Sequence, residues 1–284
     1  TVANLEAISK QEGWQLYVID LTDRQALKEV SDLEPDVIFL DHPHNWLLST
    51  VDITAVRESV SREKTIIVVD TSVQPLQREI LGERADIVVV SLSKYPSQGE
   101  TMGGVALAKP EIAKQLTAYA STRGLILAPE AAATVAVGIT SLEDRMASYT
   151  QKAEALAEFL AAQPEVAEVR LPDLSSTGAL SGGQLSITFL DVEFAKDLEV
   201  AVGWNSGNPQ FPFVLACTFG APFTTFERFS NRVSSEAAIS PLQPIPDEMV
   251  RIGIGGETAE ELLSAIEFLF GIVRLNKLET KPGR

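Results

Sequence analysis

The sequence predicts an α/β protein, in which a mostly parallel sheet flanked by helices is followed by a smaller C-terminal α+β domain. Short apolar runs alternate with helical patterns over residues 1–110, as in sheets whose parallel strands are connected by helices. Long Ala-, Leu- and Glu-rich segments follow, and after Gln163-Pro164 short strands and helices alternate. At 284 residues the chain exceeds the usual size of one compact core. We therefore expect a large domain over residues 1–162, including a long connecting helix, and a small domain over residues 163–284.

The large domain is expected to begin with alternating helices and strands. Asp23 fits the N-cap of an early helix, because its carboxylate can accept a hydrogen bond from the first turn. Apolar periodicity predicts helices at Ala3–Gln11, Arg24–Val30, Asp52–Ser61, Pro75–Gly82, Glu111–Thr122 and from Pro129 to about Ala162. Apolar, β-branched runs predict strands at Gln15–Ile19, Val37–Leu40, Ile66–Val69, Ile87–Val90 and Val105–Ala108.

The small domain is expected to mix both kinds of element. Cys217 lies in an apolar run, which favours a place in the core over a role as a nucleophile. Strands are predicted at Val166–Leu171, Gln184–Phe189, Phe213–Thr218 and Met249–Ile254, and helices near Phe194–Val202 and from Thr258 onward.

The composition argues against several classes of partner. The net charge of −16 argues against nucleic acid, because binding to a phosphate backbone needs a basic surface. The most apolar C-terminal stretch, Leu262–Leu275, contains Glu267 and Arg274 and is too short to span a membrane. The single cysteine cannot form an intrachain disulfide, so we expect a reducing compartment and a cytoplasmic protein.

Polar residues follow two of the apolar strands at the point where each strand ends. Ile66–Val69 is followed by Asp70, and Ile87–Val90 is followed by Ser91-Leu-Ser-Lys94. In open α/β sheets, ligands bind at this edge, outside the carboxyl ends of the strands. A lysine held there among apolar side chains loses its proton more readily than a surface lysine, which suits Schiff-base chemistry. The pattern therefore indicates chemistry on pyridoxal 5'-phosphate (PLP).

The groups of PLP have candidate partners at this edge. Lys94 would bind the aldehyde, and the carboxylate of Asp70 would keep the pyridine nitrogen protonated, so that the ring can accept electrons. Ser91 and Ser93 are two residues apart, so on an extended segment they share a face and could donate to the phosphate. Taken alone, Lys94 could instead cap a strand end and extend into water, and Asp70 could cap the next helix.

An ordered series of motifs runs over nearly the whole chain. The motifs are Pro35-Asp-Val-Ile-Phe-Leu-Asp-His-Pro-His-Asn45-Trp-Leu-Leu, Val51-Asp-Ile53, Val68-Val-Asp70-Thr, Ala85-Asp-Ile-Val-Val-Val-Ser-Leu-Ser-Lys-Tyr95, a weaker Cys217-Thr-Phe-Gly220, and Val250-Arg-Ile-Gly-Ile-Gly-Gly-Glu257. In this order they resemble the motifs of the Cys/Met-metabolism family of PLP-dependent enzymes. That family has the fold type I architecture of PLP-dependent transferases and includes cystathionine γ-synthases, cystathionine lyases and methionine γ-lyases.

The resemblance implies which residues would bind the cofactor. Lys94 would form the internal aldimine and later transfer protons, and Asp70 would pair with the pyridine nitrogen. Ser91 and Ser93 would hold the phosphate, and Ser72 is counted among the further cofactor contacts. Each of these residues lies at or just after the end of an expected strand.

For the substrate, the resemblance implies that Arg251 clamps the α-carboxylate with its two-donor fork, assisted by Thr218. Asn45 would contact the phenolic oxygen of PLP or the substrate carboxylate. The sequence alone leaves open that Arg251 is a surface residue of a strand, on the face opposite Val250 and Ile252. The implied reaction of such a lyase or transferase is β- or γ-elimination or replacement on a sulfur-containing or O-acylated amino acid.

The chain also departs from the family. The family's fold begins well before the position that matches Thr1, so its N-terminal segment, with a ring-stacking aromatic, a phosphate turn and a Tyr-x-Arg pair, has no counterpart here. The resemblance implies a homodimer or homotetramer, or a complex with a separate N-terminal chain. A non-catalytic or split subunit and a transaminase-type enzyme are the alternatives. No metal is expected, because His42 and His44 share a face without a third ligand at useful spacing.

Overall fold

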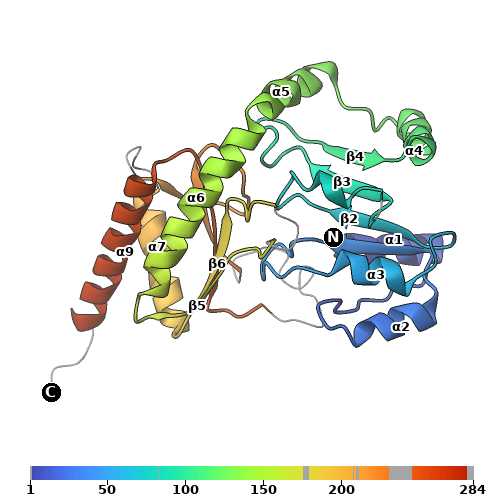
Figure 1. Cartoon of the computed structure of the whole chain (residues 1–284). Coiled ribbons are helices and arrows are strands. Elements are labelled where there is room, and N and C mark those ends of the chain that lie inside the picture. Colours follow the sequence, from blue (N-terminus) through green and yellow to red (C-terminus); the bar gives the residue numbers. More distant parts are fainter. Residues whose placement is uncertain are drawn as a thin grey trace.

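The structure is a computed structural model and describes residues 2–82, 84–174, 179–206, 208, 211–229 and 245–279. It contains a four-stranded and a five-stranded sheet (Figure 1). The first sheet has parallel strands β1 (Val37–Asp41), β2 (Ile66–Asp70) and β3 (Ile87–Ser91), with β4 (Gly104–Ala108) antiparallel at its edge. The expected mostly parallel sheet is thus confirmed.

The first unit comprises the four-stranded sheet with its helices, and the second unit comprises the five-stranded sheet with the helices packed on it. The helices of the first unit follow from apolar periodicity. α1 spans Val2–Glu12, α2 spans Ala26–Leu33 and α3 spans Ile53–Ser59. Alternate side chains of β1 to β3 are buried in one core together with residues of α2 and α3. This core fixes the strands, and with them the polar residues at their carboxyl ends.

Three helices lead from the first sheet to the second. α4 spans Pro110–Thr122, α5 spans Pro129–Thr140 and α6 spans Leu142–Ala161. The single helix expected from Pro129 to Ala162 is therefore two helices that meet at Ser141. Gly138 lets α5 approach the loop after β3, since a Cβ at this position would lie only 1.9 Å from the carbonyl oxygen of Pro96.

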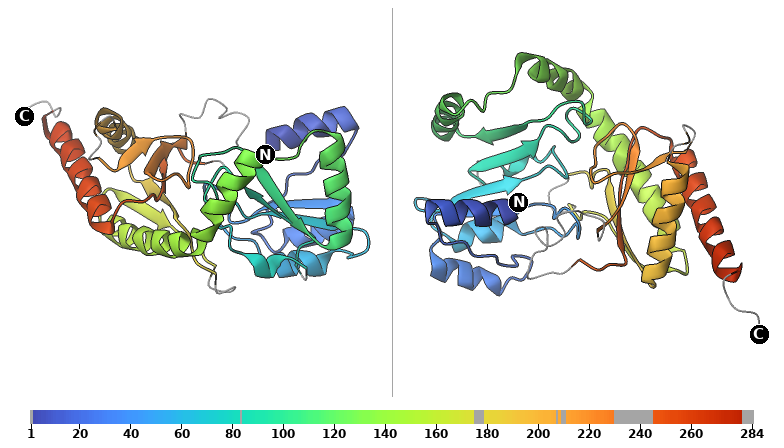
Figure 2. Two further views of the ribbon diagram at one scale, coloured as in Figure 1. Left: turned by 90° about the horizontal axis from the view of Figure 1, so that it is seen from above. Right: turned by 180° about the vertical axis from the view of Figure 1, so that it is seen from behind.

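The second sheet has the strand order β5-β6-β9-β8-β7. Figures 1 and 2 show α6, α7 and α9 packed side by side against it. Their apolar side chains fill the larger core of the protein, together with those of the sheet. The elements not yet bounded are β5 (Val166–Arg170), β6 (Gln184–Phe189), α7 (Val192–Asn205), β7 (Phe213–Leu215), β8 (Thr224–Arg228), β9 (Met249–Gly253) and α9 (Ala259–Glu279).

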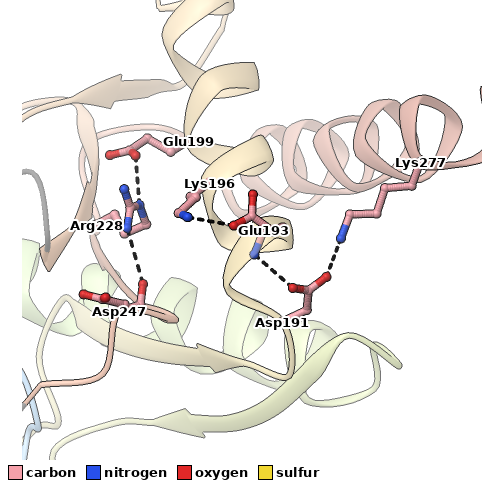
Figure 3. A network of polar contacts seen from close by, with 7 residues as sticks. All are labelled: Asp191, Glu193, Lys196, Glu199, Arg228, Asp247 and Lys277. Carbon is pink, nitrogen blue, oxygen red and sulfur yellow. Dashed lines mark hydrogen bonds and ion pairs between the residues drawn. The ribbon is translucent and has the colours of Figure 1, made fainter. Parts of the chain in front are cut away.

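Polar contacts tie α7 to its neighbours (Figure 3). Asp191 caps α7 by accepting from the backbone N–H of Glu193, and it also pairs with Lys277 of α9 at 2.6 Å. On the other side of α7, Glu199 pairs with Arg228 of β8 at 3.0 Å. None of the described helices is long and apolar enough to cross a membrane.

Two of the expected elements do not form. Gln15–Ile19 is not a strand, and Trp14 and Tyr17 beside and within it are 60% and 55% exposed. Within Pro75–Gly82, only the short 3-10 helix Arg78–Ile80 is present. There the side chain of Gln74 accepts from the backbone N–H of residue 76, and such local bonds compete with those of an α-helix.

Two further expectations at single positions need correction, and one strand of the structure has no counterpart among the expected elements. Asp23 does not cap α2, which begins at Ala26, because its carboxylate accepts from the backbone N–H of Gln25 in a turn. Cys217 is exposed rather than in the core, since β7 ends before it. The sequence pattern also does not predict β8, whose charged residues turn out to be buried in ion pairs.

We keep the division into residues 1–162 and 163–284 as a proposal. α6 buries Met146, Leu156 and Leu160 in the core of the second sheet. In its first turn, Arg145 donates to the carbonyl oxygen of Tyr95, in the loop after β3. The helix therefore packs with both units.

Candidate cofactor and substrate site

Four polar residues at the carboxyl ends of β2 and β3 are linked by hydrogen bonds. Asp70 ends β2, and its carboxylate accepts from the backbone N–H of Ser72 at 2.9 Å. The Ser72 hydroxyl accepts from the backbone N–H of Ser91 at 2.8 Å. Ser91 ends β3, and its hydroxyl oxygen lies 2.8 Å from that of Ser93. The structure therefore brings together the carboxylate and the hydroxyls that the sequence places at this edge.

Lys94 reaches from the loop after β3 to the second unit. Its Nζ donates to Thr218 Oγ1 at 2.8 Å and lies 4.8 Å from the ring centroid of Phe219. Gly220 allows this contact, since its φ is +73° and a Cβ there would lie 2.5 Å from the backbone nitrogen of Tyr95. The amine is held by a hydroxyl and an aromatic ring, in contrast to a strand-end lysine that extends into water.

Arg251 lies in the middle of β9 and is only 1% exposed, which excludes the alternative of a surface residue. Its guanidinium donates to the side-chain oxygen of Asn45, in the loop after β1, and to the carboxylate of Glu227. The same group lies 4.7 Å from the Trp46 ring centroid and 5.3 Å from that of Phe219. Arg251 therefore faces the first sheet, and it shares the Phe219 ring with the amine described above.

A second carboxyl lies beside Asp70. Asp41 ends β1 and is the direct register partner of Asp70 in the neighbouring strand. Burial, and then the charge of Asp70, raise the pKa of the Asp41 carboxyl from 3.8 to about 7, while the charge of Arg251 acts in the opposite direction. Near neutral pH, a substantial fraction of Asp41 is therefore uncharged, which lessens the repulsion between the two strand ends.

The eight residues singled out from the sequence thus form one connected set. The first group at the strand ends is joined through Lys94 to Thr218, and the ring of Phe219 connects these to Arg251 and Asn45. Their assigned roles remain proposals. The full set is Asn45, Asp70, Ser72, Ser91, Ser93, Lys94, Thr218 and Arg251.

Sequence reasoning missed four residues of this site. Asp41 had a usable signal, because it ends an apolar strand in the same way as Asp70 does. Phe219 follows Thr218 in a motif that was recognised only weakly. Glu227 and Trp46 gave no such signal, since their contacts with Arg251 are formed by segments far apart in the chain.

The histidines of the loop after β1 have structural partners. His42 Nδ1 accepts from the backbone N–H of Val51 at 3.1 Å. His44 Nδ1 accepts from those of Trp46 and Leu47. Burial lowers the pKa of both imidazoles, that of His42 to about 4. These contacts indicate that both histidines pack and brace their own loop. The described part of the chain contains no group of three or more His, Cys, Asp or Glu that could hold a metal.

The chemistry of this donor set fits PLP. The Lys94 amine can react with an aldehyde, and the paired hydroxyls of Ser91 and Ser93 can donate to a phosphate. The carboxylate of Asp70 can pair with a protonated pyridine nitrogen. All of these groups lie at the carboxyl ends of two adjacent parallel strands, where α/β proteins bind ligands.

The sequence matches a known enzyme family. The profile described as "Cys/Met metabolism PLP-dependent enzyme" matches residues 1–181. An L-methionine gamma-lyase from Pseudomonas putida is 32% identical over 265 residues, which cover 90% of this chain and 66% of that protein. An O-succinylhomoserine sulfhydrylase from Pseudomonas aeruginosa is 26% identical over 280 residues, which cover 92% of this chain and 66% of that protein. The chain thus spans just under two thirds of the length of these relatives.

Solved structures confirm the expected fold. That of cystathionine gamma synthase from Xanthomonas oryzae pv. oryzae in complex with cystathionine has a TM-score of 0.82 at 24% identity, and the match covers 96% of this chain and 72% of that chain. That of metB from Corynebacterium glutamicum has a TM-score of 0.80 at 25% identity, with 95% and 71% covered. The architecture is therefore that of fold type I PLP-dependent enzymes.

Proposed function

We propose that this chain, which belongs to the Cys/Met metabolism family of PLP-dependent enzymes, catalyses β- or γ-elimination or replacement on a sulfur-containing or O-acylated amino acid. The observation that carries the proposal is the position of Lys94. Its amine is held by Thr218 and Phe219, and its backbone directly follows the hydroxyl pair of Ser91 and Ser93 in the loop after β3. The relatives named above act on substrates of this class. We also propose that the protein is cytoplasmic.

On the cofactor side, each residue has a distinct task. PLP, when bound, supplies an electron sink that stabilises a carbanion at the substrate Cα. Lys94 would hold the cofactor and then remove the Cα proton as a general base. Asp70 would keep the pyridine nitrogen protonated, and Ser91 and Ser93 would donate to the phosphate. Ser72 would position this end of the site through its hydrogen bond to the backbone of Ser91.

On the substrate side, Arg251 would bind the α-carboxylate. Its guanidinium has a planar fork of donors that matches a carboxylate. Asn45, which accepts from the same guanidinium, would orient it or contact the substrate directly. Thr218 would accept a hydrogen bond from the Lys94 amine and so orient the lone pair of its nitrogen. Together these groups would fix the Cα–H bond in reach of the general base.

Product analysis tests the proposal. With PLP and with the N-terminal segment of a relative added, fused or separate, the protein should convert L-methionine and water to methanethiol, ammonia and 2-oxobutanoate, or convert O-succinyl-L-homoserine and L-cysteine to cystathionine and succinate. Asp70→Asn and Lys94→Ala should serve as inactive controls. If an amino group were instead transferred to a 2-oxo acid without release of ammonia or thiol, the protein would be a transaminase. If neither substrate were consumed in the presence of PLP, the non-catalytic alternative would be supported.

We further propose that a polypeptide segment corresponding to the N-terminal third of the relatives completes the site. The four-stranded sheet ends at β4, where four of the five residues are exposed, including Val105 and Leu107. Among the described residues, α4 has no buried side chain, and Val137 of α5 is 73% exposed. Exposed apolar side chains on a sheet edge and the helices that follow it are typical of an interface. A strand of such a segment would pair with the open edge of β4.

This proposal has its own test. Sedimentation and PLP titration should be compared for the chain alone and after addition of the N-terminal segment of a relative, fused or separate. We expect weak PLP binding by the chain alone and tighter binding with the segment. Val137→Asp should abolish the gain if the segment covers α5. A monomer that binds PLP tightly and turns over substrate unaided would contradict the proposal, and a dimer of the chain alone would show that a second copy covers this surface.

A further inference from the structure

The carboxylate of Glu227 lies where a ligand of Arg251 would bind. The two residues are direct register partners on the antiparallel strands β8 and β9, and the guanidinium donates to Glu227 Oε2. Glu227 is only 4% exposed. The other terminal nitrogen of the guanidinium donates to Asn45. Both terminal amino groups of the fork therefore already bind acceptors of the protein itself.

The surroundings strengthen the interaction between these charges. An arginine side chain stays protonated at any pH at which the protein is folded. The rings of Trp46 and Phe219 lie 4.7 and 5.3 Å from the guanidinium, and the side chains of the pair are only 1% and 4% exposed. In such surroundings, electrostatic interactions are much stronger than in water. A second carboxylate that approaches Arg251 would be attracted by the guanidinium and repelled by Glu227.

Phe219 lies near both the Glu227–Arg251 pair and Lys94. Its ring centroid lies 5.3 Å from the guanidinium of Arg251 and 4.8 Å from the Nζ of Lys94. The same ring therefore lies near both the lysine amine and the fork that Glu227 occupies.

We propose that Glu227 is a specificity-determining residue, which competes with the substrate α-carboxylate for the Arg251 fork. This inference rests on the proposed function, in which Arg251 binds that carboxylate. The competition lowers the preference of the site for a free carboxylate. Amino-acid derivatives whose carboxyl group is an amide or ester then bind nearly as well as the free acids.

The test separates binding from turnover. The protein is saturated with PLP, reduced with borohydride to fix the cofactor, and freed of excess cofactor. Binding of butyrate and butyramide, which differ in charge but hardly in shape, is then measured by calorimetry. Peptide mapping of the same sample locates the pyridoxyl group. A label away from Lys94 contradicts the proposed function and the inference together, whereas a label on Lys94 leaves the inference to be decided by the binding data.

The expected result is a selective gain in affinity. In the unsubstituted protein, butyrate and butyramide should bind within roughly 10-fold of each other, because the charge of Arg251 is already compensated. Glu227→Gln keeps the shape but removes the charge, so butyrate should bind at least roughly 10-fold more tightly, with butyramide unchanged. The matched control is Glu199→Gln, which removes a buried carboxylate from the pair with Arg228 (Figure 3). It should leave both affinities unchanged.

Several outcomes would overturn the inference. Glu227 does not compete if its Gln variant binds butyrate no better than the unsubstituted protein does, or if both probes gain equally. Should the Gln variant fail to fold, Glu227→Asp withdraws the carboxylate by one methylene and should give a smaller gain of the same sign. The unsubstituted protein also decides the point by itself, because a preference for butyrate over butyramide above roughly 100-fold would show an uncompensated arginine.

Discussion

Glu227 and Arg228 are neighbouring residues of β8, and each forms a buried arginine–glutamate pair with a residue of a different element. Glu227 pairs with Arg251 of β9, facing the loop after β1, and Arg228 pairs with Glu199 of α7 (Figure 3). The exposed fractions of the side chains are 1% and 4% in the first pair and 9% and 11% in the second. By burial and charge the two pairs are thus much alike.

Their surroundings differ. The guanidinium of Arg228 also donates to the backbone carbonyl of Asp247, which ties β8 to the segment before β9. The guanidinium of Arg251 instead contacts the loop after β1 and shares the ring of Phe219 with Lys94. One pair therefore links only elements of the second sheet and α7, and the other also contacts the loop after β1 and the ring that Lys94 contacts. A buried ion pair therefore indicates a function only through the further contacts that its charged groups make.

The largest expected effect belongs to the pair on α7. Arg228→Met would leave the buried carboxylate of Glu199 without its guanidinium counter-charge. Breaking a buried pair in this way costs about 3–5 kcal/mol of unfolding free energy. Urea denaturation should show this loss, while kcat/KM measured well below the transition stays unchanged. A loss of kcat/KM without a loss of stability would reverse the roles that we give to the two pairs.

The pH dependence of stability should distinguish the surroundings of the Glu227–Arg251 pair from those of the other pair. Burial raises the pKa of the Asp41 carboxyl, and the charge of Arg251 acts on the same carboxyl in the opposite direction. The pKa of Asp41 is about 7 in the folded protein and 3.8 as its ordinary value. Between these values the folded state binds more protons than the unfolded state, so stability falls as pH rises through this window. The difference corresponds to roughly 4 kcal/mol.

Asp41→Asn should remove this pH-dependent loss. The variant should therefore gain stability relative to the unsubstituted protein between pH 4 and pH 8, as measured by urea denaturation at several pH values. If the two stability curves ran parallel over this range, the Asp41 carboxyl would not titrate differently in the folded state.

The substitution Arg251→Lys tests whether the two pairs differ in their effect on catalysis. Lysine keeps the charge but loses the planar fork, so kcat/KM should fall by roughly 10²-fold, about 3 kcal/mol of transition-state stabilisation. PLP absorbance should hardly change. The matched variant Arg228→Lys should leave kcat/KM near that of the unsubstituted protein. Equal kinetics for both lysine variants would place the carboxylate clamp elsewhere.

The smallest effect is expected at an exposed pair on the same helix as Glu199. Lys196 and Glu193 are 46% and 62% exposed and lie one turn apart on α7 (Figure 3). Such pairs contribute only about 0.3–0.5 kcal/mol. Lys196→Ala should therefore change the urea midpoint very little, and a loss comparable to that of Arg228→Met would show that burial does not control the strength of these pairs.

Local patterns were sufficient to predict most of the fold. β1, β2 and β3 are β-branched apolar runs, and such runs form strands wherever both faces are covered. β8 could not be predicted in this way. Glu227 and Arg228 give it the charged character of a surface segment, and their burial depends on partners contributed by β9 and α7. A strand of this kind is specified by tertiary contacts rather than by its own sequence.

The same distinction holds for the site. Asp70 and Ser91 were predictable, because the carboxyl ends of parallel strands meet at one edge of a sheet. The contact between Lys94 and Thr218 joins segments 124 residues apart. The resemblance to a family suggested only that both belong to one site, with Thr218 beside Arg251. Neither the strand-end geometry nor the resemblance predicts the contact of Glu227 with Arg251. An arginine that binds a substrate carboxylate is not expected to pair with a carboxylate of the protein itself.

If Lys94 is the residue that holds PLP, borohydride reduction should fix the cofactor on it. The protein is incubated with PLP, reduced with borohydride, digested and analysed by mass spectrometry. The pyridoxyl group should be found on the peptide that contains Ser91 to Tyr95, and Lys94→Ala should remove the label while the far-ultraviolet circular dichroism stays unchanged. A label on another lysine, or an undiminished label in Lys94→Ala, would contradict the account.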